Sequence, residues 1–60
     1  MLLRCAANLR PYDKIRLETK LYTVKEVSAQ EDGRIKIDIV GVHSSHQIML
    51  FGNDAVEVVL

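Results

Sequence analysis

Between Leu21 and Val42 the sequence reads LYTVKEVSAQEDGRIKIDIVGV, two apolar-rich runs separated by the residues 31–33. In the second run, isoleucines alternate with charged side chains, and a period of two is typical of a half-buried strand. β-Branched residues are frequent in both runs and favour a pleated, partly buried surface. The pattern predicts a long β-hairpin with arms at 21–29 and 34–42. The rest of the chain must cover its isoleucine face, which consists of Ile35, Ile37 and Ile39.

The turn determines which residues of the two arms face each other. A two-residue loop would place the polar Ser28 opposite Ile37. A three-residue loop at 31–33 places Val27 there instead, and Gly33 supplies the left-handed conformation that this hairpin form requires. The three-residue loop keeps one apolar face and is therefore the predicted connection.

In the first arm the apolar side chains change from one face of the strand to the other, because Tyr22 and Val24 fall on the face opposite to Val27. One extra residue would bring Val24 opposite Ile39 and restore a single apolar face. We therefore predict a β-bulge at 25–26, which would also coil the hairpin more sharply. The alternative is a regular strand in which Tyr22 faces water.

Sixty residues allow one domain, and its core must be built from Ile, Val and Leu because only three aromatic residues are present. A chain of this length buries only about 60% of its unfolded surface, so oligomerisation is a common supplement. The single cysteine, Cys5, excludes an internal disulfide and is expected to be buried, reduced and inert, which favours a cytoplasmic location. We expect no signal peptide or membrane span, since Arg4 interrupts the first apolar run.

The remaining segments predict short strands and almost no helix. We expect strands at 1–5, 13–19, 47–51 and 55–60, one helical turn at 6–9, tight connections at 19–20 and 52–54, and a loop at 41–46. Leu9 should point inward as a plug. The strand 47–51 has two possible facings, with either Ile48 and Leu50 or Met49 and Phe51 inward. The chain is therefore predicted to be all-β, and five to six strands of this kind remove their exposed edges best in a small, partly open β-barrel.

The start of the chain contains Leu9, Pro11, Asp13 and Ile15 at a characteristic spacing. This pattern resembles the opening of small SH3-like barrels, a group that includes KOW-type and translation-factor-type domains and short accessory proteins of bacteria and their phages. The runs 22–27 and 56–59 resemble their second and closing strands. Tyr12 stands where the family usually has a turn glycine, and no nucleic-acid contact loop of the family is matched. The resemblance implies the fold, and a binding function by analogy alone.

The net charge is zero, but it is unevenly distributed. Residues 1–25 carry six basic and two acidic side chains, and residues 26–60 carry two basic and six acidic ones. This asymmetry can mark a nucleic-acid surface, yet early and late strands of a barrel lie side by side, where opposite charges can pair. A dedicated nucleic-acid domain normally has a basic excess. Weak nucleic-acid binding is therefore the alternative function, with Tyr12 as a stacking platform and four basic candidates: Lys14, Arg16, Lys20 and Lys25. Of the other aromatic residues, Phe51 is expected in the core and Tyr22 over one end of the barrel.

The segment 43–46 contains two histidines and two serines, residue types that occur in metal and catalytic sites. Together with Cys5 the histidines would give three zinc ligands, fewer than a structural site normally has. A serine or cysteine nucleophile would lack an orienting acid. We therefore expect no metal, no cofactor and no enzymatic activity.

The favoured function is protein–protein interaction, either self-association or docking onto a larger protein. The runs 2–3 and 58–60 carry apolar side chains on both faces of a strand, so one face needs cover. We expect a non-enzymatic module that binds a protein or a second copy of itself and that does not bind membranes. The candidate contact residues are His43, Ser44, Ser45, His46 and Val59.

Overall fold

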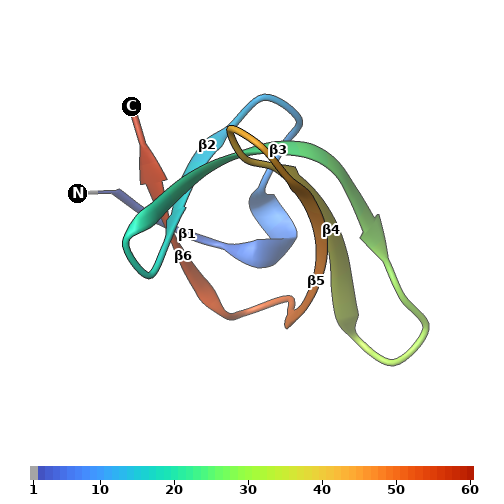
Figure 1. The fold of residues 1–60 in the computed structure, drawn as a ribbon. Helices are drawn as coiled ribbons and strands as arrows, with labels where there is room; N and C mark the ends of the chain where they lie inside the picture. Colours follow the sequence, from blue (N-terminus) through green and yellow to red (C-terminus); the bar gives the residue numbers. More distant parts are fainter. Residues whose placement is uncertain (1) are drawn as a thin grey trace.

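The computed structural model describes residues 2–60, which form one antiparallel sheet of six strands (Figure 1). The strands follow the order β1-β6-β2-β3-β4-β5 across the sheet, and β1 and β5 are its two unpaired edges. The all-β prediction with six strands is confirmed, and the sheet is not closed. The elements are β1 (Leu2–Cys5), η1 (Ala6–Asn8), β2 (Lys14–Leu17), β3 (Lys20–Ala29), β4 (Arg34–Val40), β5 (Ser45–Phe51) and β6 (Ala55–Val59). Met1, the first residue of the predicted strand 1–5, lies outside the described residues.

Strands β3 and β4 form the predicted long hairpin, although β3 begins one residue before the predicted arm 21–29 and β4 ends two residues before the end of the predicted arm 34–42. Val27 lies opposite Ile37, and Gly33 has a φ of +82°, so the three-residue loop is confirmed. The register shifts between Val24 and Glu26, which confirms the bulge and brings Val24 opposite Ile39. The extra residue therefore returns the apolar side chains of the whole hairpin to one face.

The sheet curls strongly, so that its inner face encloses the core and the turn η1 lies inside the curl (Figure 1). The isoleucine face of β4 is buried, as predicted. Leu9 follows η1 and is also buried, which confirms its role as a plug. The buried apolar residues are Ala6, Leu9, Ile15, Val24, Ile35, Ile37, Ile39, Val56 and Val58.

Backbone hydrogen bonds attach η1 to the end of β5 and the start of β6. The Ala7 N–H donates to the Gly52 carbonyl at 3.0 Å, and the Ala6 N–H donates to the Asp54 carbonyl at 2.8 Å. The Gly52 N–H donates in turn to Gly33 at 3.3 Å. Through these bonds η1 covers one end of the open side of the sheet. Most of β5 is not covered by η1.

Boundary or burial predictions were wrong in β1, β2 and β6. Strand β2 ends at Leu17, and the connection is Glu18-Thr19, with Glu18 in a left-handed conformation at a φ of +58°. Cys5 is exposed because it shares the outer face of β1 with Leu3. Leu60 is 99% exposed, because β6 ends one residue before it.

Candidate interaction surfaces

Strand β5 is an edge strand of seven residues that contains no charged residue, no proline and no glycine. Natural proteins normally protect such edges with charges, proline, bulges or short length. Met49 is 46% exposed and Phe51 is 58% exposed on its outer face, whereas Ile48 and Leu50 pack against the core. This selects one of the two predicted facings, and the expectation that Phe51 lies in the core was wrong.

The hydrogen-bond phase of the β4–β5 pair determines which backbone groups of β5 are free. The Gly41 N–H donates to Ser44 at 2.7 Å at one end of the pair, and Gly52 bonds Gly33 at the other. Bonded and non-bonded pairs alternate in an antiparallel ladder. His46, Ile48 and Leu50 therefore bond to β4. The alternate residues, Ser45, Gln47, Met49 and Phe51, direct their backbone groups to the open edge.

Phe51 is already satisfied at this edge. Its N–H donates to Asp54 Oδ2 at 2.8 Å, and its carbonyl accepts the Asp54 N–H at 3.0 Å. Within residues 2–60, no hydrogen bond is made by the edge-directed backbone groups of Ser45, Gln47 and Met49. These three residues offer an uninterrupted row of donors and acceptors.

The other edge, β1, is protected. It has only four residues, and the half-buried Arg4 on its inner side pairs with Asp13 at 3.1 Å. Leu3 is 59% exposed on the outer side. Short length and an inward-pointing charge both discourage strand addition, so β5 is the edge more open to a partner.

Polar and charged side chains of β4 lie beside β5 on the outer face. Lys36 is opposite Met49, and Asp38 is opposite Gln47. Asp38 Oδ1 is buried and has no hydrogen-bond partner among residues 2–60. A buried acceptor without a partner costs free energy, so a donor supplied next to Gln47 would be stabilising.

The predicted loop 41–46 is shorter in the structure, because Ser45 and His46 belong to β5. Of the remaining loop residues, Val42, His43 and Ser44 are exposed, and Gly41 is half-buried. His46 Nε2 is 3.0 Å from Ser44 Oγ, and its ring packs edge-to-face on Tyr22 with centroids 5.8 Å apart. No carboxylate hydrogen-bonds His46 in the described chain. Residues 2–60 also contain no group of three or more His, Cys, Asp or Glu side chains that could hold a metal.

Val59, the last of the candidate protein contacts, is half-buried on β6 opposite Lys14. Strand β6 lies between β1 and β2, so it is an interior strand. Val59 is therefore separated from the open edge that contains Ser45 and His46. The structure brings together only part of the predicted protein-binding set.

The four basic candidates are all exposed, but they do not form one free basic surface. Lys14 and Arg16 face outward on β2, and Arg16 is 3.7 Å from Glu57 on the neighbouring β6. Lys20 begins β3 after the turn, and Lys25 is at the bulge, where it lines a shallow hollow with Asp38. The contact between Arg16 and Glu57 is the predicted pairing of charges between the two halves of the chain.

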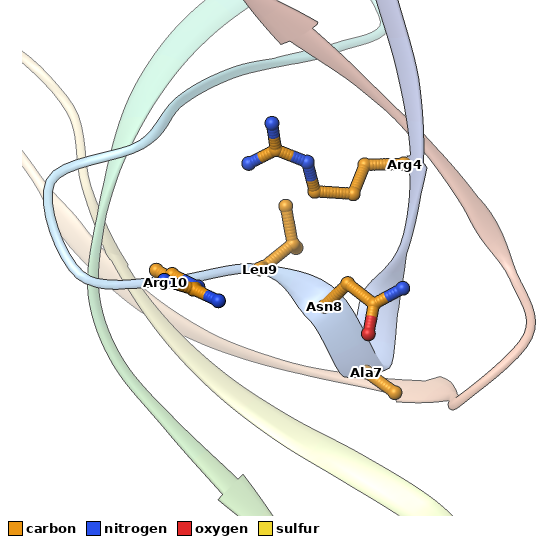
Figure 2. Close-up of a pocket in the computed structure, with 5 residues that line it drawn as sticks. All are labelled: Arg4, Ala7, Asn8, Leu9 and Arg10. Atoms are coloured by element: carbon orange, nitrogen blue, oxygen red, sulfur yellow. The ribbon is translucent and has the colours of Figure 1, made fainter.

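A hollow of about 490 Å³ at η1 was not predicted from the sequence (Figure 2). Figure 2 shows Arg4 reaching from β1 over Leu9, with Arg10 beyond Leu9. The helical turn brings these two arginines to one hollow, although nothing in their sequence spacing indicates it. Its lining residues are Arg4, Ala7, Asn8, Leu9 and Arg10.

Asp13 organises the turn beside this hollow. Its Oδ2 accepts the Arg10 N–H at 2.9 Å as well as the Arg4 guanidinium. Tyr12 is held at a φ of +76°, and its N–H donates to the Val24 carbonyl at 2.8 Å. The Tyr12 side chain is 87% exposed. A non-glycine residue in the left-handed region is uncommon, and its conformation is imposed here by the surrounding hydrogen bonds.

Comparisons of this chain with protein-family models, with curated proteins and with solved structures find no significant match. Within residues 2–60, no helix has the length and hydrophobicity needed to cross a bilayer.

Proposed function

We propose that this protein is a non-enzymatic binding module that receives a strand of a protein partner along the free edge of β5. The observation that carries the proposal is the uncharged, seven-residue edge with three consecutive edge-directed residues unbonded. In strand addition, main-chain hydrogen bonds supply affinity and the alternating side-chain contacts supply specificity. Here Met49 and Gln47 would contact the partner on the outer face, and Ile48 would contact it on the inner face.

We further propose that the curled sheet belongs to the SH3-like barrel class. The curl around a central plug and the bulged, coiled hairpin support this assignment. A second support is the conformation of Tyr12, which has the left-handed φ that the glycine of the family's opening turn would adopt. The turn geometry is thus compatible with the family although the glycine is absent.

A Met49→Pro variant tests the role of the β5 edge. The Met49 N–H points away from β4, so proline removes an edge donor without removing a ladder hydrogen bond. Peptides would be selected by display on the wild-type protein, and their dissociation constants measured by fluorescence anisotropy. We expect Met49→Pro to weaken binding at least tenfold.

Met49→Ala is the matched control, because it shortens the side chain but keeps the N–H. It should weaken peptide binding less than Met49→Pro does. Equal binding by the wild type and Met49→Pro would contradict the proposal. Circular dichroism would verify that both variants retain the β-sheet.

Weak nucleic-acid binding is a second candidate, favoured by the exposure of Tyr12 next to Arg10. A stacking aromatic flanked by basic side chains suits single strands. The test is binding of a fluorescent oligonucleotide, with a salt dependence expected from phosphate contacts. If this candidate is correct, Tyr12→Ala and Arg10→Glu should each abolish binding, and Met49→Pro should leave it unchanged. Oligonucleotide binding unaffected by Tyr12→Ala and Arg10→Glu would reject this site.

A further inference from the structure

We propose that the partner at the β5 edge is β5 of a second copy, paired antiparallel about a twofold axis that passes between the two Gln47 residues. The proposal rests on the proposed function and names its partner. It predicts a closed dimer with a continuous twelve-stranded sheet. Three observations support it: the hydrogen-bond phase, the absence of charge on β5 and the contrast with β1.

The hydrogen-bond phase selects the register. Each bonded pair of an antiparallel ladder exchanges two hydrogen bonds. With Gln47 opposite Gln47, Ser45 lies opposite Met49 twice, so all the free edge groups are used and six bonds form. An axis at Ile48 would use only two bonded pairs, because the backbone groups of Phe51 are already occupied by Asp54. An axis at His46 would also use only two, because it places Met49 opposite His43, which precedes β5. The Gln47-centred register therefore satisfies the largest number of groups.

Electrostatics permits this self-pairing. Strand β5 has no charge, and the whole chain has a net charge of zero. In this register Asp38 lies in line with the two Gln47 residues and with Asp38 of the second copy. The two carboxylates are separated by three strand spacings, roughly 14 Å, which exceeds the screening length of about 8–10 Å at physiological salt. Their repulsion is therefore weak.

On the outer face, the side chains in line with the twofold axis also complement each other. The side-chain amides of the two Gln47 residues can pair across the axis, since each has donor and acceptor groups. Pairing also covers Met49, which is 46% exposed in the single chain.

Pairing of β5 with β1 of another copy is less favourable. Strand β1 offers only four residues and carries Arg4 on its inner side, where Asp13 binds it. Such a contact is head-to-tail, so it produces an open chain of subunits unless the rotation happens to close. The β5–β5 contact closes with two copies.

A charge exchange at Gln47 tests the dimer and its register together. The variants Gln47→Lys and Gln47→Glu each place like charges opposite each other across the axis. In sedimentation velocity we expect a wild-type dimer and an at least tenfold larger dissociation constant for each variant. An equimolar mixture of the two variants should dimerise again, and high salt should weaken that mixed dimer. The matched controls are Thr19→Lys and Thr19→Glu in the exposed β2–β3 turn, which should dimerise like the wild type.

Ser45→Lys combined with Met49→Lys provides an independent variant, because it places lysines opposite each other twice in the same register. It should be monomeric, whereas Ser45→Glu combined with Met49→Lys should remain dimeric. Circular dichroism identifies any variant that has lost its fold. If one set of variants is unfolded, the other set, at Gln47 or at Ser45 and Met49, tests the dimer.

A monomeric wild type at millimolar concentration would overturn the dimer, as would a dimer insensitive to both Gln47 variants. If the equimolar mixture of Gln47→Lys and Gln47→Glu does not dimerise, the proposed register is wrong. In a monomeric protein, peptide binding that Met49→Pro abolishes would leave the proposed function standing and remove only the self-pairing. If the protein is a monomer and shows no such peptide binding, both the self-pairing and the proposed function are overturned.

Discussion

Substitution of Gly33 measures how strongly the hairpin turn contributes to the fold. Gly33 has a φ of +82°, and a Cβ added to it would meet no atom within 4 Å. The effect of alanine is therefore conformational and not steric. An L-residue in the left-handed region costs about 1–2 kcal/mol, a large share of the roughly 3–9 kcal/mol expected for 60 residues. Since 1 kcal/mol corresponds to about 4–8 °C in a domain of this size, Gly33→Ala should lower the Tm by that amount or more.

The matched control uses the mirror-image residue, since a chain of 60 residues is accessible to chemical synthesis. D-Alanine at position 33 prefers positive φ and restricts the unfolded chain, so it should raise stability by about 0.4–1 kcal/mol. Thermal and urea unfolding would be followed by circular dichroism at one fixed protein concentration, because association would shift the Tm. If L- and D-alanine change the stability in the same direction, the conformational reasoning is refuted.

Three further predictions address the core, the strained turn and the charged turn. Ile37 is fully buried, so Ile37→Ala should cost about 2–5 kcal/mol and leave little folded protein in urea titrations; a loss below 1 kcal/mol would contradict its central place in the core. Tyr12→Gly should raise the free energy of unfolding by up to about 1 kcal/mol in the same titrations, because glycine adopts the φ of +76° without a Cβ penalty; destabilisation would show that the ring contributes packing. The Arg34 guanidinium, whose Nε is 2.6 Å from Asp32 Oδ2, lowers the pKa of Asp32. Because this pKa is lower in the folded state, the contribution to stability is present above the unfolded value of about 3.9. It is lost as the pH falls through the folded pKa. An NMR titration of the Asp32 carboxyl should show the lowered value in the wild type and an ordinary value in Arg34→Ala.

Local rules were sufficient for much of the fold. The alternation at 34–40, the glycine of the turn and the parity change before Val27 each have one economical solution, because a single apolar face must be maintained along both arms. The hairpin register and the bulge could therefore be predicted residue by residue. The facing of β5 could not, since both parities of that strand are apolar and the two assignments bury similar side chains.

The candidate site was less accessible to prediction. Ser45 and His46 were recognised as candidates, but as loop residues, and Gln47 and Met49 were not recognised at all. The property that distinguishes Ser45, Gln47 and Met49 is the direction of their backbone groups away from β4, which depends on which residue pairs of the β4–β5 ladder are hydrogen-bonded. No side-chain pattern encodes that phase.

The amino-acid sequence by itself determined an all-β chain, its bulged hairpin and its aliphatic core, because period, turn chemistry and parity act between residues close together in the chain. Only the tertiary structure decided which strands are edges, because edge position depends on the order of strands across the sheet. It also decided that Arg4 protects β1 and that β5 has no comparable protection. Those properties arise from contacts between distant segments, and the burial of one face of a strand does not specify which neighbour lies beside it.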